Sequence, residues 1–439
     1  MHPARQGKGT ALGHLLPPVT HWKSSSDASL ADDRTALFEE YGPKIKRCGR
    51  KFKDLDENDF CQKVVRSRAL ACGLCPSIGL ICQTYTLVGR KQVVANSKAN
   101  VQTALNAEEP SPMEILILGA AGMVGRKLVD RLVTERQIGG RQITSAILHD
   151  VVGPSEPEHA AFPIKILTSD FSSAEEAAKL VASRPDVIFH LAAVVSGEAE
   201  ADFEKGIRIN LDGTRHLFDA IRAIDDGYVP RVVFTSSIAV FGAPFPEAIS
   251  DEFFLTPLTS YGTQKAIGEL LLSDYTRRGF FDGVGIRLPT ICVRPGRPNR
   301  AASGFFSSII REPLSGHEVE LPVPDEVRHT HASPRSAVNF LLHAAALDGS
   351  ALGPRRNLTM PGVSVTVAEQ IEALRRIAGD RVAARIRRAP DPSIMSIVEG
   401  WPRRFDAKRA KALGFRAEES FDEIIRIHID DELGGSFAA

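Results

Sequence analysis

Tyr261 and Lys265 stand four positions apart in Ser260–Arg277, a segment whose pattern predicts an α-helix, so both side chains fall on one helix face. A free phenol ionises near pH ~10 and is a poor base at neutral pH. A neighbouring ammonium favours the phenolate and lowers the pKa of the phenol. Such a pair can take the proton of a substrate hydroxyl while hydride leaves the same carbon. We therefore predict Tyr261 as an acid–base group, with Lys265 lowering its pKa and hydrogen-bonding the ribose of a nicotinamide cofactor.

Ser237 makes the catalytic interpretation of this pair specific, because a tyrosine and a lysine at helical spacing are common by chance. Ser236-Ser237 follows 232–235, a short apolar segment that predicts a strand. A hydroxyl at the end of that strand can hydrogen-bond the substrate oxygen and hold it for hydride transfer. We predict Ser237, Tyr261 and Lys265 as the catalytic set, with Ser237 and Tyr261 also contacting the substrate.

A glycine-rich turn between the predicted strand 114–118 and a segment of helical spacing predicts the cofactor site. Gly119 permits the tight turn, Gly122 lets backbone approach a pyrophosphate, and Gly125 lets the helix pack closely on the sheet. The helix N-terminus offers free N–H groups and a positive dipole end to the phosphates. The predicted cofactor contacts of this element are Gly119, Gly122, Met123, Val124 and Gly125.

Two aspartates follow the next two predicted strands. Asp150 comes after 143–148, where its carboxylate can accept hydrogen bonds from the adenosine ribose and repel a 2′-phosphate, so NAD is favoured over NADP. A surface acid at a loop start is the alternative. Asp170-Phe171 follows 164–167 and could bracket the adenine, and an aspartate at a helix N-terminus is the alternative there.

Strands and helices alternate from residue 113 to residue 290, which is typical of crossover connections in a parallel sheet. The fold class is therefore α/β, a Rossmann-type doubly wound parallel sheet with a smaller C-terminal substrate lobe. We expect residues 113–290 to form the NAD-binding domain and residues 291–439 to form mainly the substrate-binding lobe. Further strands are expected at 187–191 and 284–288, and helices at 175–182, 210–224, 334–347, 367–378 and 406–413.

Residues 1–112 differ from the rest of the chain, because they lack clear periodicity and hold five of its six cysteines. We expect an extension that is disordered, or that results from an assigned start upstream of a true start at Met113. Cys72-x-x-Cys75 could form a zinc site, but its spacing to the other cysteines is irregular. His329 and His331 also lack a third ligand, so we predict no metal.

The amino-acid composition limits which binding partners and which cellular location we expect. Lys plus Arg and Asp plus Glu both number 54, so net charge gives no reason to expect nucleic acid or an anionic membrane. The cysteines are too few for a disulfide scaffold in 439 residues. No uninterrupted apolar segment predicts a signal peptide or a membrane span. We expect a cytoplasmic protein that binds neither nucleic acid nor membrane.

The chain carries four motifs of one family: Gly119-Ala-Ala-Gly-Met-Val-Gly125, His190-Leu-Ala-Ala193, Thr235-Ser-Ser-Ile-Ala-Val-Phe-Gly242 and Tyr261-Gly-Thr-Gln-Lys265. Over about residues 113–433 it resembles the extended short-chain dehydrogenase/reductase family, in its NAD-dependent epimerase/dehydratase group. The resemblance implies the roles argued for Tyr261, Lys265 and Ser237, and a possible homodimer through 210–224 and 260–277. It also implies further cofactor contacts, at Leu191, Ala192, Ala193, Asn210 and Pro289.

Three more segments narrow the substrate by resemblance. Residues 196–203, 287–296 and 329–335 resemble a subgroup of that family, the D-erythronate dehydrogenases. This implies oxidation of the C2 hydroxyl of a four-carbon sugar acid, from D-erythronate to 2-dehydro-D-erythronate plus NADH. A carboxylate substrate favours an arginine partner, and we predict Arg297. Arg294, Arg328 and Arg335 are further candidates, and His329 and His331 could contact substrate hydroxyls.

Two other functions stay open. The first is a nucleotide-sugar epimerase or dehydratase that retains its NAD and shows no net redox change. Phe241 weighs against it, because many epimerases have tyrosine at that position. The second is a non-catalytic NAD(P)-sensing protein on the same fold. Such proteins usually lose the tyrosine or the lysine, and this chain has both Tyr261 and Lys265.

Overall fold

The structure is a computed structural model that describes residues 113–296 and 303–438. The predictions made for residues 1–112 lie outside the described residues, and so does Arg297, the predicted carboxylate ligand.

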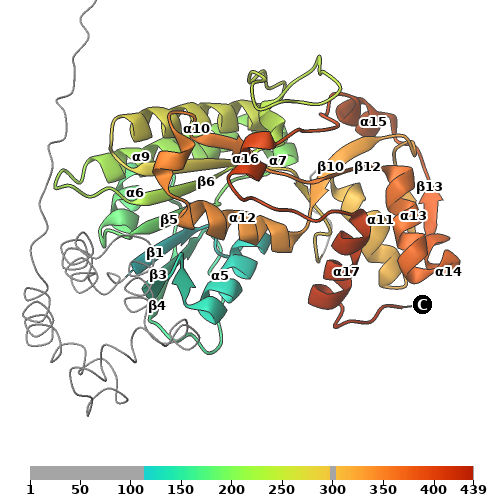
Figure 1. Ribbon diagram of the computed structural model, residues 1–439, viewed down its shortest axis with the longest axis horizontal. Coiled ribbons are helices and arrows are strands. Elements are labelled where there is room, and N and C mark those ends of the chain that lie inside the picture. Colours follow the sequence, from blue (N-terminus) through green and yellow to red (C-terminus); the bar gives the residue numbers. More distant parts are fainter. Residues whose placement is uncertain (1–112, 297–302, 439) are drawn as a thin grey trace, which may run out of the picture. The chain divides into compact units, whose positions relative to one another are not determined.

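A parallel-dominated sheet forms the centre of the fold (Figure 1). The described residues give it eight strands in the order β11-β7-β6-β5-β1-β3-β2, and β4 also pairs with β3. The β2–β3 pair is antiparallel, whereas the neighbours of β1, β5, β6 and β7 are all parallel. The α/β prediction is confirmed. The strands are β1 (Met113–Leu118), β2 (Gln137–Ile138), β3 (Arg141–Asp150), β4 (Ile164–Thr168), β5 (Val187–His190), β6 (Arg231–Ser237), β7 (Asp282–Leu288) and β11 (Asn357–Thr359).

Side chains alternate across β1 and divide between two apolar layers. Ile115 and Ile117 pack with buried residues of α5 (Met123–Glu135) and α12 (Pro334–Ala346). Leu116 and Leu118 belong to the cluster on the other face. That face is covered by α6 (Ala174–Val181), α9 (Thr214–Arg222) and α10 (Ser260–Arg277). Both faces of the sheet are therefore buried, as its nearly continuous apolar strands require.

The predicted helix at 210–224 is two elements in the structure. A π-helical segment, Ile207–Gly213, precedes α9. Gly213 lies so close to Phe171 that a Cβ added to it would be 2.8 Å from the aromatic ring. The glycine thus lets this segment approach the core, and the widened turn places Asn210 in the interior.

The region after residue 290 is shared between the main sheet and a second apolar core. β11 pairs with β7, and α12 covers the sheet beside α5, so these elements extend the main sheet and the helix layer on one of its faces (Figure 1). The second core is formed by β9 (Val319–Leu321), β12 (Val363–Thr366), β13 (Ile386–Arg388), α11 (Gly304–Leu314), α13 (Val367–Ala378), α14 (Asp380–Ala383), α15 (Pro392–Glu399) and α17 (Phe421–Glu432). The buried apolar residues of β8 (Thr290–Ile291), β10 (Arg328–Ala332) and α16 (Lys408–Ala412) belong to the first core instead.

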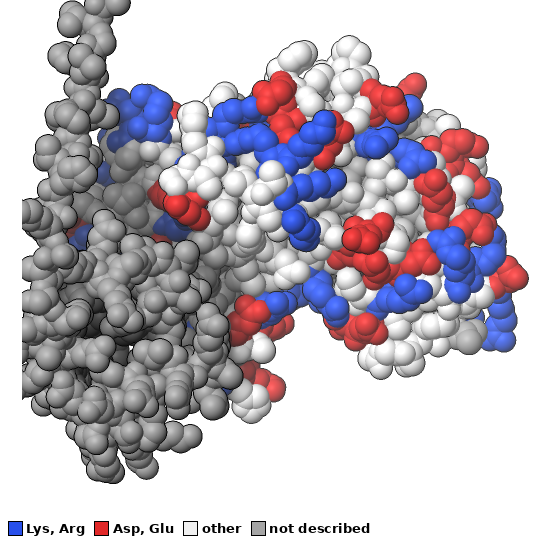
Figure 2. All heavy atoms as spheres, in the orientation of Figure 1, with Lys and Arg blue, Asp and Glu red and all other residues white. Residues whose placement is uncertain are grey.

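The described surface mixes charges of both signs. On the face shown in Figure 2, Lys and Arg side chains alternate with Asp and Glu, and the described atoms of that face present no broad field of one sign. Among the described helices, none has the length and apolar character needed to cross a bilayer.

Candidate active site

The glycine turn after β1 is closely packed. Gly119 has φ +90°, and a Cβ there would lie 2.7 Å from the amide nitrogen of Ala192. A Cβ on Gly125 would lie 2.1 Å from the Gly119 carbonyl oxygen. Both positions therefore need glycine. The close contact of Gly125 is with the turn itself, whereas we expected it to be with the sheet.

The first turn of α5 is open to an anion. The helix begins at Met123 after Gly122, no side chain caps it, and no acidic residue lies in its first turn. Its first amides therefore have no intrahelical acceptor and face outward with the positive end of the helix dipole. These residues fit the pyrophosphate of NAD, which Met123 and Val124 would hold through backbone N–H groups, whereas the Gly122 amide donates to the Gly119 carbonyl oxygen (3.2 Å).

Asp150 lies beside this turn at the end of β3. Its Oδ2 accepts a hydrogen bond from the amide of Ala121 (3.0 Å), and its Oδ1 accepts one from the amide of Val151 (2.7 Å). The carboxylate is thereby held at the turn with lone pairs left for ribose hydroxyls. Asp170 differs, because it forms an ion pair with Arg208 and accepts the Ser172 amide.

Asp150→Asn is expected to lower the preference for NAD over NADP, measured as the ratio of kcat/KM values, by on the order of 10–100-fold. The variant keeps an oxygen acceptor for the Ala121 amide but removes the charge that repels a 2′-phosphate. Asp186→Asn is the matched control, because Asp186 also accepts a backbone amide, that of Glu114, but lies at the opposite end of the sheet. An unchanged ratio in Asp150→Asn would show that Asp150 does not distinguish the 2′-hydroxyl of NAD from the 2′-phosphate of NADP.

Tyr261 reaches Ser237 because α10 begins close to the end of β6. The Thr259 hydroxyl accepts the amide of Gly262 (3.0 Å) and caps the helix, which puts Tyr261 in the first turn. A Cβ on Gly262 would lie 2.1 Å from the Ala239 carbonyl oxygen, so this helix start packs directly on the turn after Ser237. The predicted catalytic set is thus brought together in one cavity.

That cavity has a volume of about 310 Å³. It combines apolar walls with a few polar groups, which is typical of a small-molecule site. Of the residues predicted from the sequence, it is lined by Val124, Leu191, Ala193, Ser237, Tyr261, Lys265 and Pro289. It is also lined by Thr259 and Trp401, for which the sequence carried no signal, and by Thr290, Arg294 and His329.

Lys265 is almost completely buried, at 2% exposed. Its Nζ donates to the Thr235 carbonyl oxygen (2.8 Å) and lies 5.8 Å from the centroid of the Tyr261 ring. Burial lowers the pKa of Lys265 to about 7, and the charge of Glu269 opposes that shift. Near neutral pH, Lys265 therefore exists in both its charged and its neutral form.

The charge that acts on Tyr261 comes from Arg294. Burial raises the pKa of the Tyr261 phenol, and the guanidinium of Arg294 and a hydrogen bond with Ser237 both oppose this. The Ser237 oxygen accepts the Ala239 amide (3.1 Å), so its own hydrogen is free to donate to the phenol. Arg294 and Ser237 are thus the groups that oppose the effect of burial on Tyr261. The lowering of the Tyr261 pKa by Lys265 stays a prediction.

Asn210 acts behind the cavity. It is buried, its Oδ1 accepts the Val194 amide (2.9 Å), and its Nδ2 donates to the Gln264 side chain (2.8 Å). Gln264 directly precedes Lys265 on α10. Asn210 thus joins the loop after β5 to the catalytic helix, and the geometry gives it a positioning role.

His329 prepares Thr290 as a hydrogen-bond acceptor. Its Nδ1 contacts the Pro402 carbonyl oxygen (3.0 Å) and its Nε2 contacts the Thr290 hydroxyl (2.8 Å). Burial lowers the pKa of His329 to about 4, so the ring is neutral at pH 7. Since a carbonyl only accepts, Nδ1 carries the proton, Nε2 accepts from Thr290, and the lone pairs of Thr290 are left for a substrate hydroxyl.

His331 lies apart from this arrangement. It is buried against Gln370 at 3.1 Å and does not line the cavity. Within the described ranges 113–296 and 303–438, no group of three His, Cys, Asp or Glu side chains is placed to hold a metal ion.

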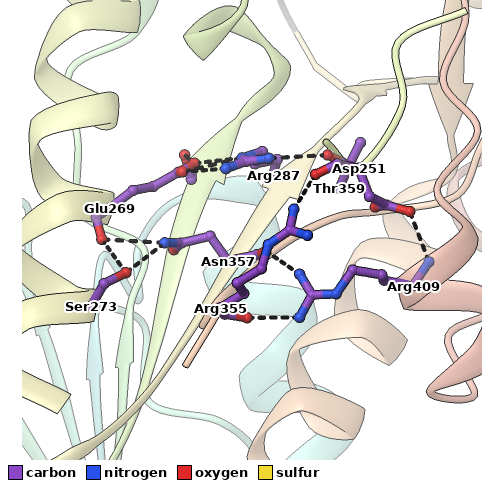
Figure 3. A network of polar contacts seen from close by, with 9 residues as sticks. Asp251, Glu269, Ser273, Arg287, Arg355, Asn357, Thr359 and Arg409 are labelled. Atoms are coloured by element: carbon purple, nitrogen blue, oxygen red, sulfur yellow. Dashed lines mark hydrogen bonds and ion pairs between the residues drawn. The ribbon is translucent and has the colours of Figure 1, made fainter. Parts of the chain in front are cut away.

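A buried ion pair between Glu269 and Arg287 joins α10, which carries Tyr261 and Lys265, to β7 (Figure 3). Arg287 on β7 donates to both carboxylate oxygens of Glu269 on α10, with Nη2 to Oε2 at 2.7 Å and Nε to Oε1 at 2.9 Å. Ser236, which directly precedes Ser237 on β6, donates to Glu269 Oε1 (2.6 Å). The Arg287 guanidinium also lies 5.1 Å from the ring centroid of Phe241. Glu269 thus fixes α10 against β6 and β7 one turn after Lys265.

Comparison with known proteins identifies relatives over this whole region. The sequence profile described as "NAD dependent epimerase/dehydratase family" matches residues 115–346. Two relatives are named D-erythronate dehydrogenase. The one from Cupriavidus necator is 47% identical over 73% of this chain and 98% of its own length. The one from Haemophilus influenzae is 38% identical over 73% of this chain and 100% of its own length.

Solved structures show the same architecture. A structure described as a nucleoside-diphosphate-sugar epimerase from Agrobacterium tumefaciens is 64% identical, with a TM-score of 0.74, over 75% of this chain and 98% of its own. A GalE-like L-threonine dehydrogenase from Cupriavidus necator has a TM-score of 0.64 over 72% of this chain and 99% of its own. It is 22% identical and therefore supports the fold alone.

Proposed function

This chain belongs to the NAD-dependent epimerase/dehydratase family, and we propose that it oxidises the C2 hydroxyl of D-erythronate, with Tyr261 as the base. Its relatives make it an NAD-dependent dehydrogenase that acts on a CH–OH group. The products are 2-dehydro-D-erythronate and NADH. The observation that carries the proposal is the cavity in which Tyr261, Ser237 and Lys265 meet Arg294, beside a glycine turn that fits NAD.

The proposed mechanism assigns each proton to a named atom. Ser237 and the Tyr261 phenol bind the C2 hydroxyl oxygen and orient it. The phenolate of Tyr261 takes the hydroxyl proton as the carbon–oxygen double bond forms and the C2–H bond breaks. Bound NAD would supply the hydride acceptor. In the free enzyme the charge of Arg294 and the hydrogen bond from Ser237 stabilise the phenolate, and once the substrate binds the Ser237 hydrogen turns to the C2 oxygen. Lys265 would hydrogen-bond the nicotinamide ribose.

The substrate is tested by NADH absorbance on the purified protein with NAD and a panel of sugar acids. We expect D-erythronate to have the highest kcat/KM, above L-threonate and above the uncharged polyol erythritol. If none of the four-carbon acids produced NADH, the proposed substrate would be wrong.

A second candidate is a nucleotide-sugar epimerase that keeps its NAD bound, which the description of the Agrobacterium relative favours. Phe241 argues against it, since the ring is buried in an apolar cluster under Arg287 and offers the cavity no hydroxyl. Nuclear magnetic resonance of UDP-glucose and UDP-galactose incubated with the enzyme separates the two. An epimerase interconverts them without accumulating NADH, and we expect no interconversion.

The setting of the reaction is part of the same proposal. We propose a cytoplasmic enzyme whose partner is its small sugar-acid substrate, acting as a homodimer through the region of α9 and α10. Size-exclusion chromatography with light scattering measures the oligomeric state directly.

A further inference from the structure

Among the described residues, Arg294 is the arginine that lines the cavity of Tyr261 and Ser237. The side chain is half-buried, and its Nε donates to the Ile291 carbonyl oxygen (3.2 Å). No described carboxylate forms an ion pair with it. By contrast, Arg328 pairs with Glu369, and Arg335 pairs with Asp431. The guanidinium therefore keeps N–H donors available inside the cavity.

The position of Arg294 is fixed by α11. Its amide donates to the Ser307 hydroxyl (3.0 Å), and its carbonyl oxygen accepts Arg311 Nη1 (2.8 Å). Arg311 is itself paired with Glu312. Because the backbone and the Nε of Arg294 are held, the side chain loses little further freedom when an anion binds. A bidentate contact between its guanidinium and a carboxylate is therefore favourable.

An unpaired charge in this cavity is costly, and a bound anion removes that cost. Burial lowers the pKa of Arg294, as expected for a guanidinium taken from water without a counter-ion. Arg294 and Tyr261 line the same cavity, and the guanidinium lowers the pKa of the phenol. One small molecule can therefore contact both.

We propose that Arg294 binds the carboxylate of the substrate and so restricts the enzyme to 2-hydroxy carboxylates. In such acids the carboxyl carbon is bonded directly to the hydroxyl-bearing carbon, so holding the carboxylate at Arg294 brings the hydroxyl to Tyr261. The hydroxyl groups farther along the chain are then left for acceptors such as Thr290. This inference rests on the proposed function and assigns to Arg294 the role that the sequence had suggested for Arg297.

The test compares Arg294→Gln with the wild type on D-erythronate and on its uncharged amide, D-erythronamide. The wild type should prefer the acid by on the order of 100-fold in kcat/KM, and the variant should lose most of that preference. Activity on both substrates should decrease, because the guanidinium also lowers the pKa of Tyr261, but the decrease should be much larger on the acid, which alone loses the carboxylate contact. Arg294→Lys should recover part of the preference, because it keeps the charge. Arg335→Gln, outside the cavity, should behave like the wild type. Equal losses on acid and amide in Arg294→Gln would overturn the assignment.

Binding separates this inference from the proposed function. D-erythronate is titrated by calorimetry into NADH-loaded wild type and Arg294→Gln, with NADH affinity measured first. If the wild type binds the acid, Arg294→Gln binds it much more weakly, and the wild type does not turn it over, the proposed reaction is refuted and the role of Arg294 in carboxylate binding stands. If turnover of the acid is unchanged in Arg294→Gln, or if the acid binds both proteins equally, only the assignment of Arg294 to carboxylate binding is refuted.

Discussion

Tyr261→Phe is expected to lower kcat for D-erythronate oxidation by roughly 10²–10⁴-fold, because it removes the group that takes the hydroxyl proton. Affinity for NAD should stay within about threefold of wild type, since the ring remains in place. Burial raises the pKa of Tyr261, so the phenolate is a minor form at neutral pH and wild-type kcat should increase with pH. The residual activity of the variant should lack this increase. Steady-state kinetics from pH 6 to pH 10 and a calorimetric NAD titration measure both effects.

Tyr275→Phe is the matched control for this experiment. Tyr275 lies on the same helix, α10, but its hydroxyl donates to Asp219 (2.7 Å), away from the cavity. It should lose about 1 kcal/mol of stability and keep its kcat within about twofold. If Tyr261→Phe also kept turnover within a few-fold of wild type, Tyr261 would not be the base. Loss of turnover in both variants would indicate damage to the helix instead.

Arg287→Met is expected to lower the free energy of unfolding by about 3–5 kcal/mol, because it leaves the Glu269 carboxylate buried without its partner. The side chain of Glu269 is 1% exposed, so water cannot replace the lost donors. For a domain of this size the loss corresponds to a decrease in Tm of roughly 5–8 °C. Differential scanning calorimetry measures it.

Two comparisons isolate the charge effect. The double variant Glu269→Met/Arg287→Met should be more stable than Arg287→Met, because no charge is then left unpaired. Arg335→Met breaks the more exposed pair with Asp431 and should cost at most about 1 kcal/mol. A Tm for Arg287→Met no lower than that of Arg335→Met would mean that the Glu269–Arg287 pair does not hold the catalytic elements together.

Local patterns predicted the cofactor-binding half of the fold well. The helix predicted at 260–277 has those bounds in the structure, because its N-terminal cap, Thr259, and its apolar spacing are both local. The glycine turn and Asp150 also meet as predicted, since the ends of neighbouring parallel strands lie at one edge of a sheet.

Features that depend on contacts distant in sequence were not predicted. β11 pairs with β7 across about 70 residues of sequence, and no periodicity indicates that register. The π-helical turn at Asn210 depends on the approach of Gly213 to Phe171. Glu269 stands four positions after Lys265, a spacing that could have suggested a shared helix face, but only the fold shows that it meets Arg287.

The electrostatics of the site depend on burial as much as on residue type. Spacing alone suggested that Lys265 activates Tyr261, but burial lowers the pKa of Lys265 to about 7, and its Nζ donates a hydrogen bond to the Thr235 carbonyl oxygen. Arg294 could be named only as one of several candidate arginines. Its unpaired charge, the property that singles it out, appears only when the neighbours of each arginine are known.

The central claim, hydride removal from C2 of a 2-hydroxy acid, is tested most directly with D-erythronate that carries deuterium at C2. The purified enzyme is incubated with this substrate and NAD, and the NADH formed is analysed by mass spectrometry. We predict NADH that accumulates with the 2-oxo acid and contains one deuterium per molecule. NADH without deuterium, or no NADH despite binding of the acid, would contradict the account.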